Sequence, residues 1–190
     1  MGLGLKRGTV VLEPHSEQWD SNARETIYLL ESILGYDAID IQHIGSTSIK
    51  NIMAKPIIDI AVGVRDFNSM IKHNEELADK GIIFRGQDVK RQLLYVMGDF
   101  ENDTRTHHIH VVIWNQREWT NYINFRDYLN SNDEMALKYS MMKEELSKRY
   151  MNDRSSYTNG KQEMIDNILR QACKLTATDI DGKTVVAKNK

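Results

Sequence analysis

The sequence predicts an α+β fold, in which a mixed β-sheet with helices is followed by a helical C-terminal third. Two observations predict it. Short apolar segments, alternating or continuous, recur through the first two thirds of the chain and are typical of strands. From Gln116 to Leu175 the apolar residues recur instead at helical spacing. With 190 residues, of which 41% are hydrophobic, the chain is long enough to bury a core.

The composition narrows the class of protein. A net charge of −2 gives no support for nucleic-acid binding. The single cysteine, Cys173, can form neither an intramolecular disulfide nor a zinc–thiolate cluster, which suits a reducing compartment. No apolar run approaches the ~18 residues of a membrane-spanning helix, and the N-terminus does not resemble a signal peptide. We therefore expect a cytoplasmic protein without a membrane or nucleic-acid partner, and the sequence leaves the oligomeric state open.

The chain reads as one domain over residues 1–175, followed by a polar tail over residues 176–190. It has two prolines and no Gly-rich or Ser-rich linker that would mark an internal boundary. The tail, TATDIDGKTVVAKNK, is polar and is expected to be loosely held.

The elements of the first two thirds follow from local signals. Residues 9–13 predict a short strand, and Ser16 can cap a helix that ends at Gly35. Residues 38–44 alternate as a strand, with Ile41 and His43 on the same face. Asp66 can cap a further helix that ends at Gly81. The remaining strands are expected over residues 57–64, 82–85, 92–97 and 107–114.

Three helices are expected in the last third, each with one apolar stripe. The stripes are Trp119, Tyr122, Ile123 and Leu129; then Met135, Tyr139, Met142, Leu146 and Tyr150; then Met164, Ile165, Ile168, Leu169 and Ala172. They must pack on each other or on the sheet.

The segment HIGSTS, which begins at His43, is the first candidate for chemistry. Glycine permits a tight turn, and N–H groups and hydroxyls after it can bind an anion. The alternative is a structural turn in which Ser46 or Ser48 acts as a helix cap.

Asp59 interrupts the apolar run of residues 57–64, which suits a central strand covered on both faces. An unpaired buried carboxylate costs several kcal/mol, so it requires a basic partner, a metal ion or an opening to solvent. The choice between a structural salt bridge and a metal-binding or catalytic carboxylate remains open.

The segment RTHHIHVV, from Arg105 to Val112, contains half of the six histidines. On a strand, His108 and His110 share a face, where two imidazoles can bind a metal or an anion, and His107 faces the other way. If this strand neighbours that of Asp59, a mixed His/Asp site forms. The alternative is a solvated strand end.

Taken together, these segments resemble the GrpB family, small proteins related to the nucleotidyltransferase fold. The resemblance extends from about residue 10 to residue 172. It rests on separate motifs in a fixed order: Glu13-Pro14-His15 with Trp19, HIGSTSIKNIMAKPIIDIAV, RTHHIHVV, FRDYL, and Tyr157 with Lys161.

The resemblance implies a nucleotidyltransferase-like mixed sheet, with Gly45 and Ser46 in the phosphate-binding turn and Asp59 on the next strand. Active nucleotidyltransferases carry a second carboxylate two positions later and a third on a later strand, and these hold Mg²⁺. Here position 61 is Ala, and His108 and His110 stand where the third acid is expected. Imidazole suits Zn²⁺ or Mn²⁺ better than Mg²⁺.

Three functions therefore stay open. The first is nucleotidyl or phosphoryl transfer on a nucleotide or other small molecule, with Mg²⁺, Mn²⁺ or Zn²⁺, and with Asp59, His108 and His110 as metal ligands or catalytic groups. The second is a binding or regulatory module, similar to the domain fused to dephospho-coenzyme A kinase in some bacteria. The third is a hydrolase with one metal ion on the same three residues. The residues assigned to phosphate or substrate are His43, Gly45, Ser46, Thr47, Lys55, Arg126 and Lys161.

Overall fold

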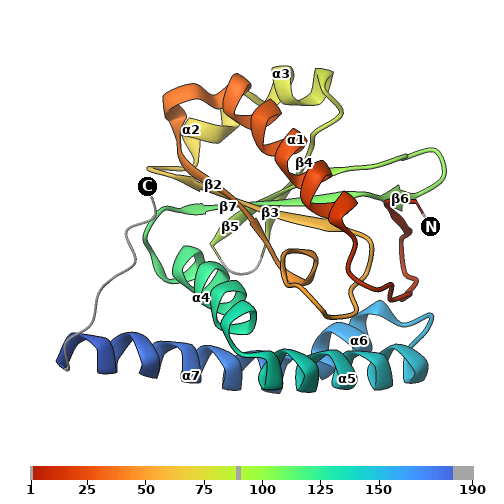
Figure 1. Ribbon diagram of the computed structural model, residues 1–190. Coiled ribbons are helices and arrows are strands. Elements are labelled where there is room, and N and C mark those ends of the chain that lie inside the picture. The colour runs from red at the N-terminus through yellow and green to blue at the C-terminus, as the bar shows by residue number, and fades with distance from the viewer. Residues whose placement is uncertain (1, 89–90, 182–190) are drawn as a thin grey trace.

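The structure, a computed structural model, describes residues 2–88 and 91–181 and has the predicted α+β architecture. A five-stranded sheet lies between two groups of helices (Figure 1). The first group contains α1 (Glu17–Leu34), α2 (Asn68–Ile71) and α3 (Asn74–Asp79). The second group, on the opposite side, contains α4 (Arg117–Ser131), α5 (Asp133–Arg149), α6 (Arg154–Gly160) and α7 (Gln162–Asp181).

The strand order of the sheet is β2-β3-β7-β5-β4. Its strands are β2 (Ala38–Ile44), β3 (Ile58–Val64), β4 (Ile83–Asp88), β5 (Gln92–Met97) and β7 (His107–Ile113). Strands β3 and β7 are parallel, and the other neighbouring pairs are antiparallel. Because parallel strands begin at the same edge of a sheet, the first residues of β3 and β7 lie side by side.

The strand predicted over residues 9–13 is wrong. A two-stranded sheet instead pairs β1 (Leu5–Lys6) with β6 (Thr104–Arg105). The backbone groups of this segment hydrogen-bond to separate parts of the chain. The N–H of Val10 donates to the carbonyl of Met151, whereas Glu13 forms an isolated bridge with Ala54. No single neighbouring strand is aligned with the described segment, so it cannot join a ladder.

Helix α1 begins and ends where the sequence predicts. The Ser16 side chain accepts a hydrogen bond from the N–H of Gln18, and Gly35 ends the helix at φ +49°. The helix predicted after Asp66 is divided into α2 and α3. Asp66 does accept the N–H of Ser69, but the chain then breaks near His73, whose ring lies 2.9 Å from Asp37.

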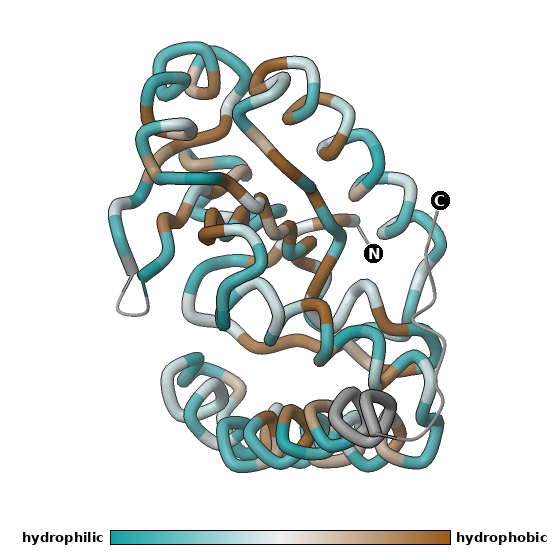
Figure 2. Tube along the Cα trace, turned by 90° about the vertical axis from the view of Figure 1, so that its left-hand side faces the viewer, coloured by the Kyte–Doolittle hydropathy of each residue, from teal (hydrophilic) through white to brown (hydrophobic). Residues whose placement is uncertain are grey.

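Three apolar clusters hold the layers together. The largest joins α1 to one face of the sheet and includes Leu30, Ile60 and Ile109. A smaller cluster, with Ala61 and Trp119, lies under α4 on the other face. A third lies among α4, α5 and α7. Figure 2 shows that hydrophobic residues are concentrated in the strands at the middle of the molecule.

The helical third contains the three predicted helices and one that was not predicted, α6, whose N-cap Asp153 accepts the N–H of Ser156. Helix α7 continues to Asp181, so it includes the backbone of residues 176–181, and residues 182–190 of the predicted tail lie outside the described residues. Within residues 2–88 and 91–181, no helix combines the length and apolar character that crossing a membrane requires.

Candidate functional site

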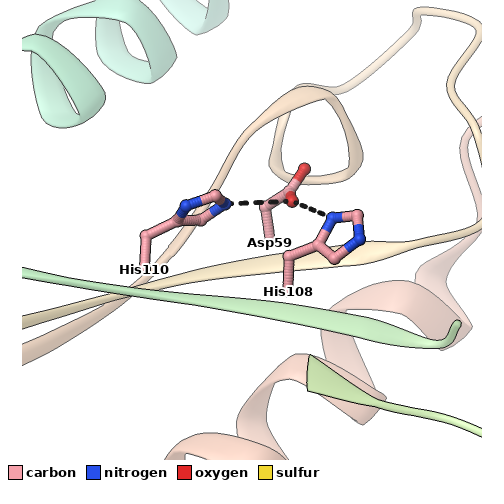
Figure 3. A group of neighbouring side chains, drawn as sticks. All are labelled: Asp59, His108 and His110. Carbon is pink, nitrogen blue, oxygen red and sulfur yellow. Dashed lines mark hydrogen bonds and ion pairs between the residues drawn. The ribbon is translucent and has the colours of Figure 1, made fainter. Parts of the chain in front are cut away.

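Asp59, His108 and His110 come together because β3 and β7 are parallel and in register. Asp59 lies opposite His108, and Ala61 lies opposite His110. The three side chains project from the same face of the sheet, toward one another (Figure 3). His107 faces α1, where its ring lies 3.1 Å from the hydroxyl of Thr26. The predicted facing of the three histidines is therefore confirmed.

The hydrogen bonds of His108 define its protonation. Its Nδ1 lies 3.2 Å from Asp59 Oδ1, and its Nε2 lies 3.3 Å from a guanidinium nitrogen of Arg154. A guanidinium only donates hydrogen bonds, so Nε2 accepts and the ring proton sits on Nδ1, which donates to Asp59. Burial lowers the pKa of His108, although Asp59 partly opposes that shift. His108 is thus a neutral donor to the carboxylate.

Asp59 carries a negative charge at physiological pH. Burial alone raises the pKa of a carboxyl group, but hydrogen bonds from His108 and His110 outweigh it and hold the pKa of Asp59 well below its usual range. His110 Nε2 lies 3.5 Å from Asp59 Oδ1. The other nitrogen of that ring, Nδ1, is buried and has no hydrogen-bond partner among the described residues. His110 therefore retains one unused polar atom.

Gly45 is required by the close packing of the turn on Asp59. Its backbone has φ +70° and ψ −168°, a conformation that essentially only glycine adopts. A Cβ atom at Gly45 would lie 2.5 Å from Asp59 Oδ2. The next residues form one 3₁₀ turn, Ser46–Ser48, in which the Ser48 hydroxyl donates to the carbonyl of Gly45. The turn is therefore held directly against the carboxylate.

A cavity of about 390 Å³ lies between this face of the sheet and the helical third, beside the contact of α4 with the sheet. Asp59, His108 and His110 line it on the sheet side, beside Gly45 and Ser46. Its aromatic and aliphatic lining residues are Ile44, Ile57, Tyr122, Phe125, Tyr139, Tyr157, Ile165 and Leu169. A volume of this size is within the usual range for small-molecule sites.

The charges in this cavity are unbalanced. Among the described residues that line it, Asp59 is the single carboxylate, whereas the cationic side chains are Lys55, Lys143, Arg154 and Lys161. Lys143 is 1% exposed and donates to the carbonyl of Met53. The ammonium groups of Lys55 and Lys161 lie 5.5 and 4.8 Å from the centre of the Tyr157 ring. Basic side chains therefore outnumber carboxylates four to one among these residues.

The pKa values of the lysines reflect this crowding. Burial lowers the pKa of Lys55 to about 7, and repulsion from Arg154 and Lys161 adds to the shift. Burial also lowers the pKa of Lys161, and holds the pKa of Lys143 well below its usual value. An anion in the cavity would oppose all three shifts, because it favours the charged form of each lysine.

The structure brings some of the predicted ligand-binding residues to the cavity and places others elsewhere. Gly45, Ser46, Lys55 and Lys161 line it. The remaining three, His43, Thr47 and Arg126, do not.

The positions of those three residues have a local cause. His43 lies opposite Ile60 and faces α1, where its Nδ1 is 3.5 Å from Asp20 and its Nε2 is 2.9 Å from the hydroxyl of Thr47. Thr47 is 1% exposed, so its hydroxyl lies on the buried side of the turn. Arg126 donates to the carbonyl of His43 and to Gln42 Oε1. This contact ties α4 to the edge strand.

Lys143 and Arg154 line the cavity but are not among the residues that the sequence assigns to the site. Lys143 follows Tyr139 by one helical turn and therefore shares the apolar stripe of α5. That position was the available signal. Arg154 had none, because α6 was not predicted.

Ala61 departs from the carboxylate pattern of nucleotidyltransferases and has both apolar and polar neighbours. It is fully buried in a cluster with Ile44, Val112 and Trp119. Its partners on the two neighbouring strands are Gln42 and His110. The strand therefore carries Asp59 but no second carboxylate two residues later.

The donor set suits one transition-metal ion. Ligand atoms of Asp59, His108 and His110 lie within 4.8 Å of one another. Tetrahedral ligands at about 2.0–2.1 Å from Zn²⁺ are separated by roughly 3.3 Å. The 3.2 and 3.5 Å between the carboxylate oxygen and the two ring nitrogens are close to that separation. Two imidazoles and one carboxylate favour Zn²⁺ or Mn²⁺ over Mg²⁺.

The sheet and its helices define a nucleotidyltransferase-like fold. A crystal structure of the Cid1 poly(U) polymerase with MgGTP bound superposes with a TM-score of 0.52, covering 78% of this chain and 50% of that chain. The sequence identity is 18%, so this likeness shows the fold alone.

Within that class, the chain belongs to the GrpB family, because the model of the GrpB protein family matches residues 9–171. The glutamate-rich protein GrpB of Alkalihalophilus pseudofirmus is 42% identical over 172 residues, which is 89% of this chain and 99% of the relative. The crystal structure of the conserved protein GrpB from Enterococcus faecalis has a TM-score of 0.81 at 27% identity, covering 88% of this chain and 99% of that one. The predicted family and fold are confirmed.

Proposed function

We propose that the cavity binds a phosphorylated small molecule of the nucleotide class, and that the protein transfers a nucleotidyl or phosphoryl group from it. The observation that carries this proposal is the charge of the lining: Lys55, Lys143, Arg154 and Lys161 surround one carboxylate. Buried charges without partners are costly, and a ligand with several negative charges offsets that cost.

The lining residues suit a ligand that has two parts, one with phosphate groups and one uncharged. The lysines contact phosphate as point charges, and Arg154 adds the planar geometry that binds two phosphate oxygens at once. The hydroxyl of Ser46 donates from the turn. Tyr122 and Phe125, on α4, provide flat apolar surface for the uncharged part.

Asp59, His108 and His110 would hold one metal ion in place of the Mg²⁺ pair, which requires a second carboxylate. Bound there, the ion would supply Lewis acidity to the phosphorylated ligand. Support comes from the fold, which in Cid1 binds MgGTP, and from the spacing of the three ligand atoms.

Thermal unfolding of metal-stripped protein tests the proposal. Nucleoside triphosphates and Mg²⁺, Mn²⁺ or Zn²⁺ are added singly and in pairs. We expect the largest rise in Tm for a pair, because each component binds the folded state. The rise should vanish in Asp59→Asn and shrink in Lys161→Gln, but persist in Lys148→Gln, whose side chain is exposed on the same protein. No rise with any nucleotide would contradict the proposal.

Ala61 favours a second candidate, a binding module without turnover, because the residue that would complete a Mg²⁺ pair is absent. The two candidates are separated by incubating the protein with a triphosphate that raises its Tm and measuring release of pyrophosphate or phosphate. Binding without release supports the module. A rise in Tm with the metal alone, together with hydrolysis of phosphate esters, would instead favour a hydrolase that uses the same three residues.

A further inference from the structure

The contact between Arg154 and His108 limits how the site can accept a metal ion. His108 uses both ring nitrogens: Nδ1 faces Asp59 at 3.2 Å, and Nε2 faces the Arg154 guanidinium at 3.3 Å. Because the guanidinium has no acceptor, this arrangement exists only while the ring proton is on Nδ1.

A metal ion requires the opposite arrangement. The nitrogen of His108 that faces Asp59 is Nδ1, and it can bind a metal only after losing its proton. The neutral ring then carries its proton on Nε2, which points at Arg154. Two donors would face each other at hydrogen-bond distance, so the contact between Arg154 and His108 cannot survive.

We infer that a metal ion and Arg154 compete for His108, and that metal binding releases the guanidinium of Arg154 to bind the anionic part of the ligand. The inference rests on the proposed function, because it deepens the metal site and the anion site of that proposal.

The surroundings of Arg154 indicate where its side chain goes. Arg154 is the first residue of α6, lines the cavity and is only partly buried, so the side chain has room to turn. The same cavity contains Lys55 and Lys161, whose charges already repel Arg154. Asp59 attracts Arg154 in the metal-free site, and a bound metal ion would offset that attraction, so a released guanidinium beside the two lysines is best stabilised when an anion is present. Metal and anion therefore favour each other's binding, and this coupling is reciprocal.

Two variants distinguish competition between Arg154 and the metal ion for His108 from a general effect of positive charge on metal binding. Arg154→Met removes the guanidinium and cannot donate to His108. Lys161→Met removes one positive charge from the same cavity but breaks no described hydrogen bond to His108. Zn²⁺ affinity is measured by competition with a chromophoric chelator, and anion affinity by calorimetry with inorganic tripolyphosphate.

We expect Arg154→Met to tighten Zn²⁺ binding at least about fivefold more than Lys161→Met does. In the wild-type protein, Zn²⁺ should tighten tripolyphosphate binding at least about fivefold, and Arg154→Met should remove most of that coupling. Equal changes in Zn²⁺ affinity for the two variants would overturn the inference while leaving the proposed metal site intact.

Long-range ¹H–¹⁵N NMR spectra of the wild-type protein provide a readout that does not depend on any variant folding. The ring of His108 should carry its proton on Nδ1 without metal and on Nε2 with Zn²⁺. A proton on Nε2 in the metal-free protein would overturn the inference. If the protein binds tripolyphosphate but no Zn²⁺, the inference fails and the anion site stands; if it binds neither, the proposed function fails as well.

Discussion

The substitution Gly45→Ala tests how tightly the turn packs on Asp59. The backbone conformation of Gly45, φ +70° and ψ −168°, costs any other residue about 1–3 kcal/mol. The added Cβ would lie 2.5 Å from Asp59 Oδ2 and 2.9 Å from Asp59 Cβ, so the turn or the carboxylate must shift. Overpacking of this kind costs about 1–3 kcal/mol more. We therefore expect a loss of about 2–6 kcal/mol in the free energy of unfolding.

Urea unfolding followed by tryptophan fluorescence measures this loss, and Gly35→Ala is the matched control. Gly35 also has a positive φ, +49°, but a Cβ there would meet no described atom within 4 Å. The control should therefore lose only the conformational part, about 1–3 kcal/mol. Gly45→Ala should also weaken Zn²⁺ binding, because Asp59 is displaced. An equal loss of stability in the two variants would refute the close approach of the turn to the carboxylate.

Three further predictions concern buried groups. Lys143→Met should raise the unfolding midpoint in urea, because it removes an ammonium group that burial disfavours and that forms no ion pair with a described carboxylate, and should weaken tripolyphosphate binding; a lower midpoint would contradict this. Ala61→Asp should destabilise the protein in the same assay, because position 61 is fully buried and the neighbouring His110 offsets only part of the cost of burying a carboxylate; wild-type stability would show that His110 offsets that cost completely. Burial lowers the pKa of His43 and of His107 from 6.5 to about 4, so between those values the unfolded chain binds more protons and stability must fall as the pH falls. The free energy of unfolding, measured by urea titration at pH 7, 6, 5 and 4, should fall by about 1.4 kcal/mol per pH unit for each fully shifted histidine, and a rise on acidification would contradict the assignment.

The parts of the site on strands could be predicted, because alternation along a strand is a local property. It placed His108 and His110 on one face and His107 on the other, and the structure agrees. The same alternation grouped His43 with Ile41, which packs against α1. The assignment of His43 to phosphate came from its place beside the Gly-Ser turn and not from its face.

The parts of the site on the helical side depend on how helices pack, which local patterns do not reveal. Lys161 was assigned from the family resemblance. Arg126 was assigned in the same way, yet α4 directs it to the backbone of β2. Arg154 depends on α6, a helix of one or two turns that is fixed by the cap at Asp153 and by its neighbours. Short helices carry too few apolar positions to be recognised by periodicity.

One metal ion and a phosphorylated ligand are proposed to share the cavity beside β3 and β7. The most direct measurement is a crystal structure of the protein with Zn²⁺ and a non-hydrolysable nucleoside triphosphate analogue, with diffraction data collected at the zinc absorption edge. We expect an anomalous peak between Asp59, His108 and His110, and phosphate density next to Lys55 and Lys161. A zinc ion at another site, or phosphates bound outside the cavity, would contradict it.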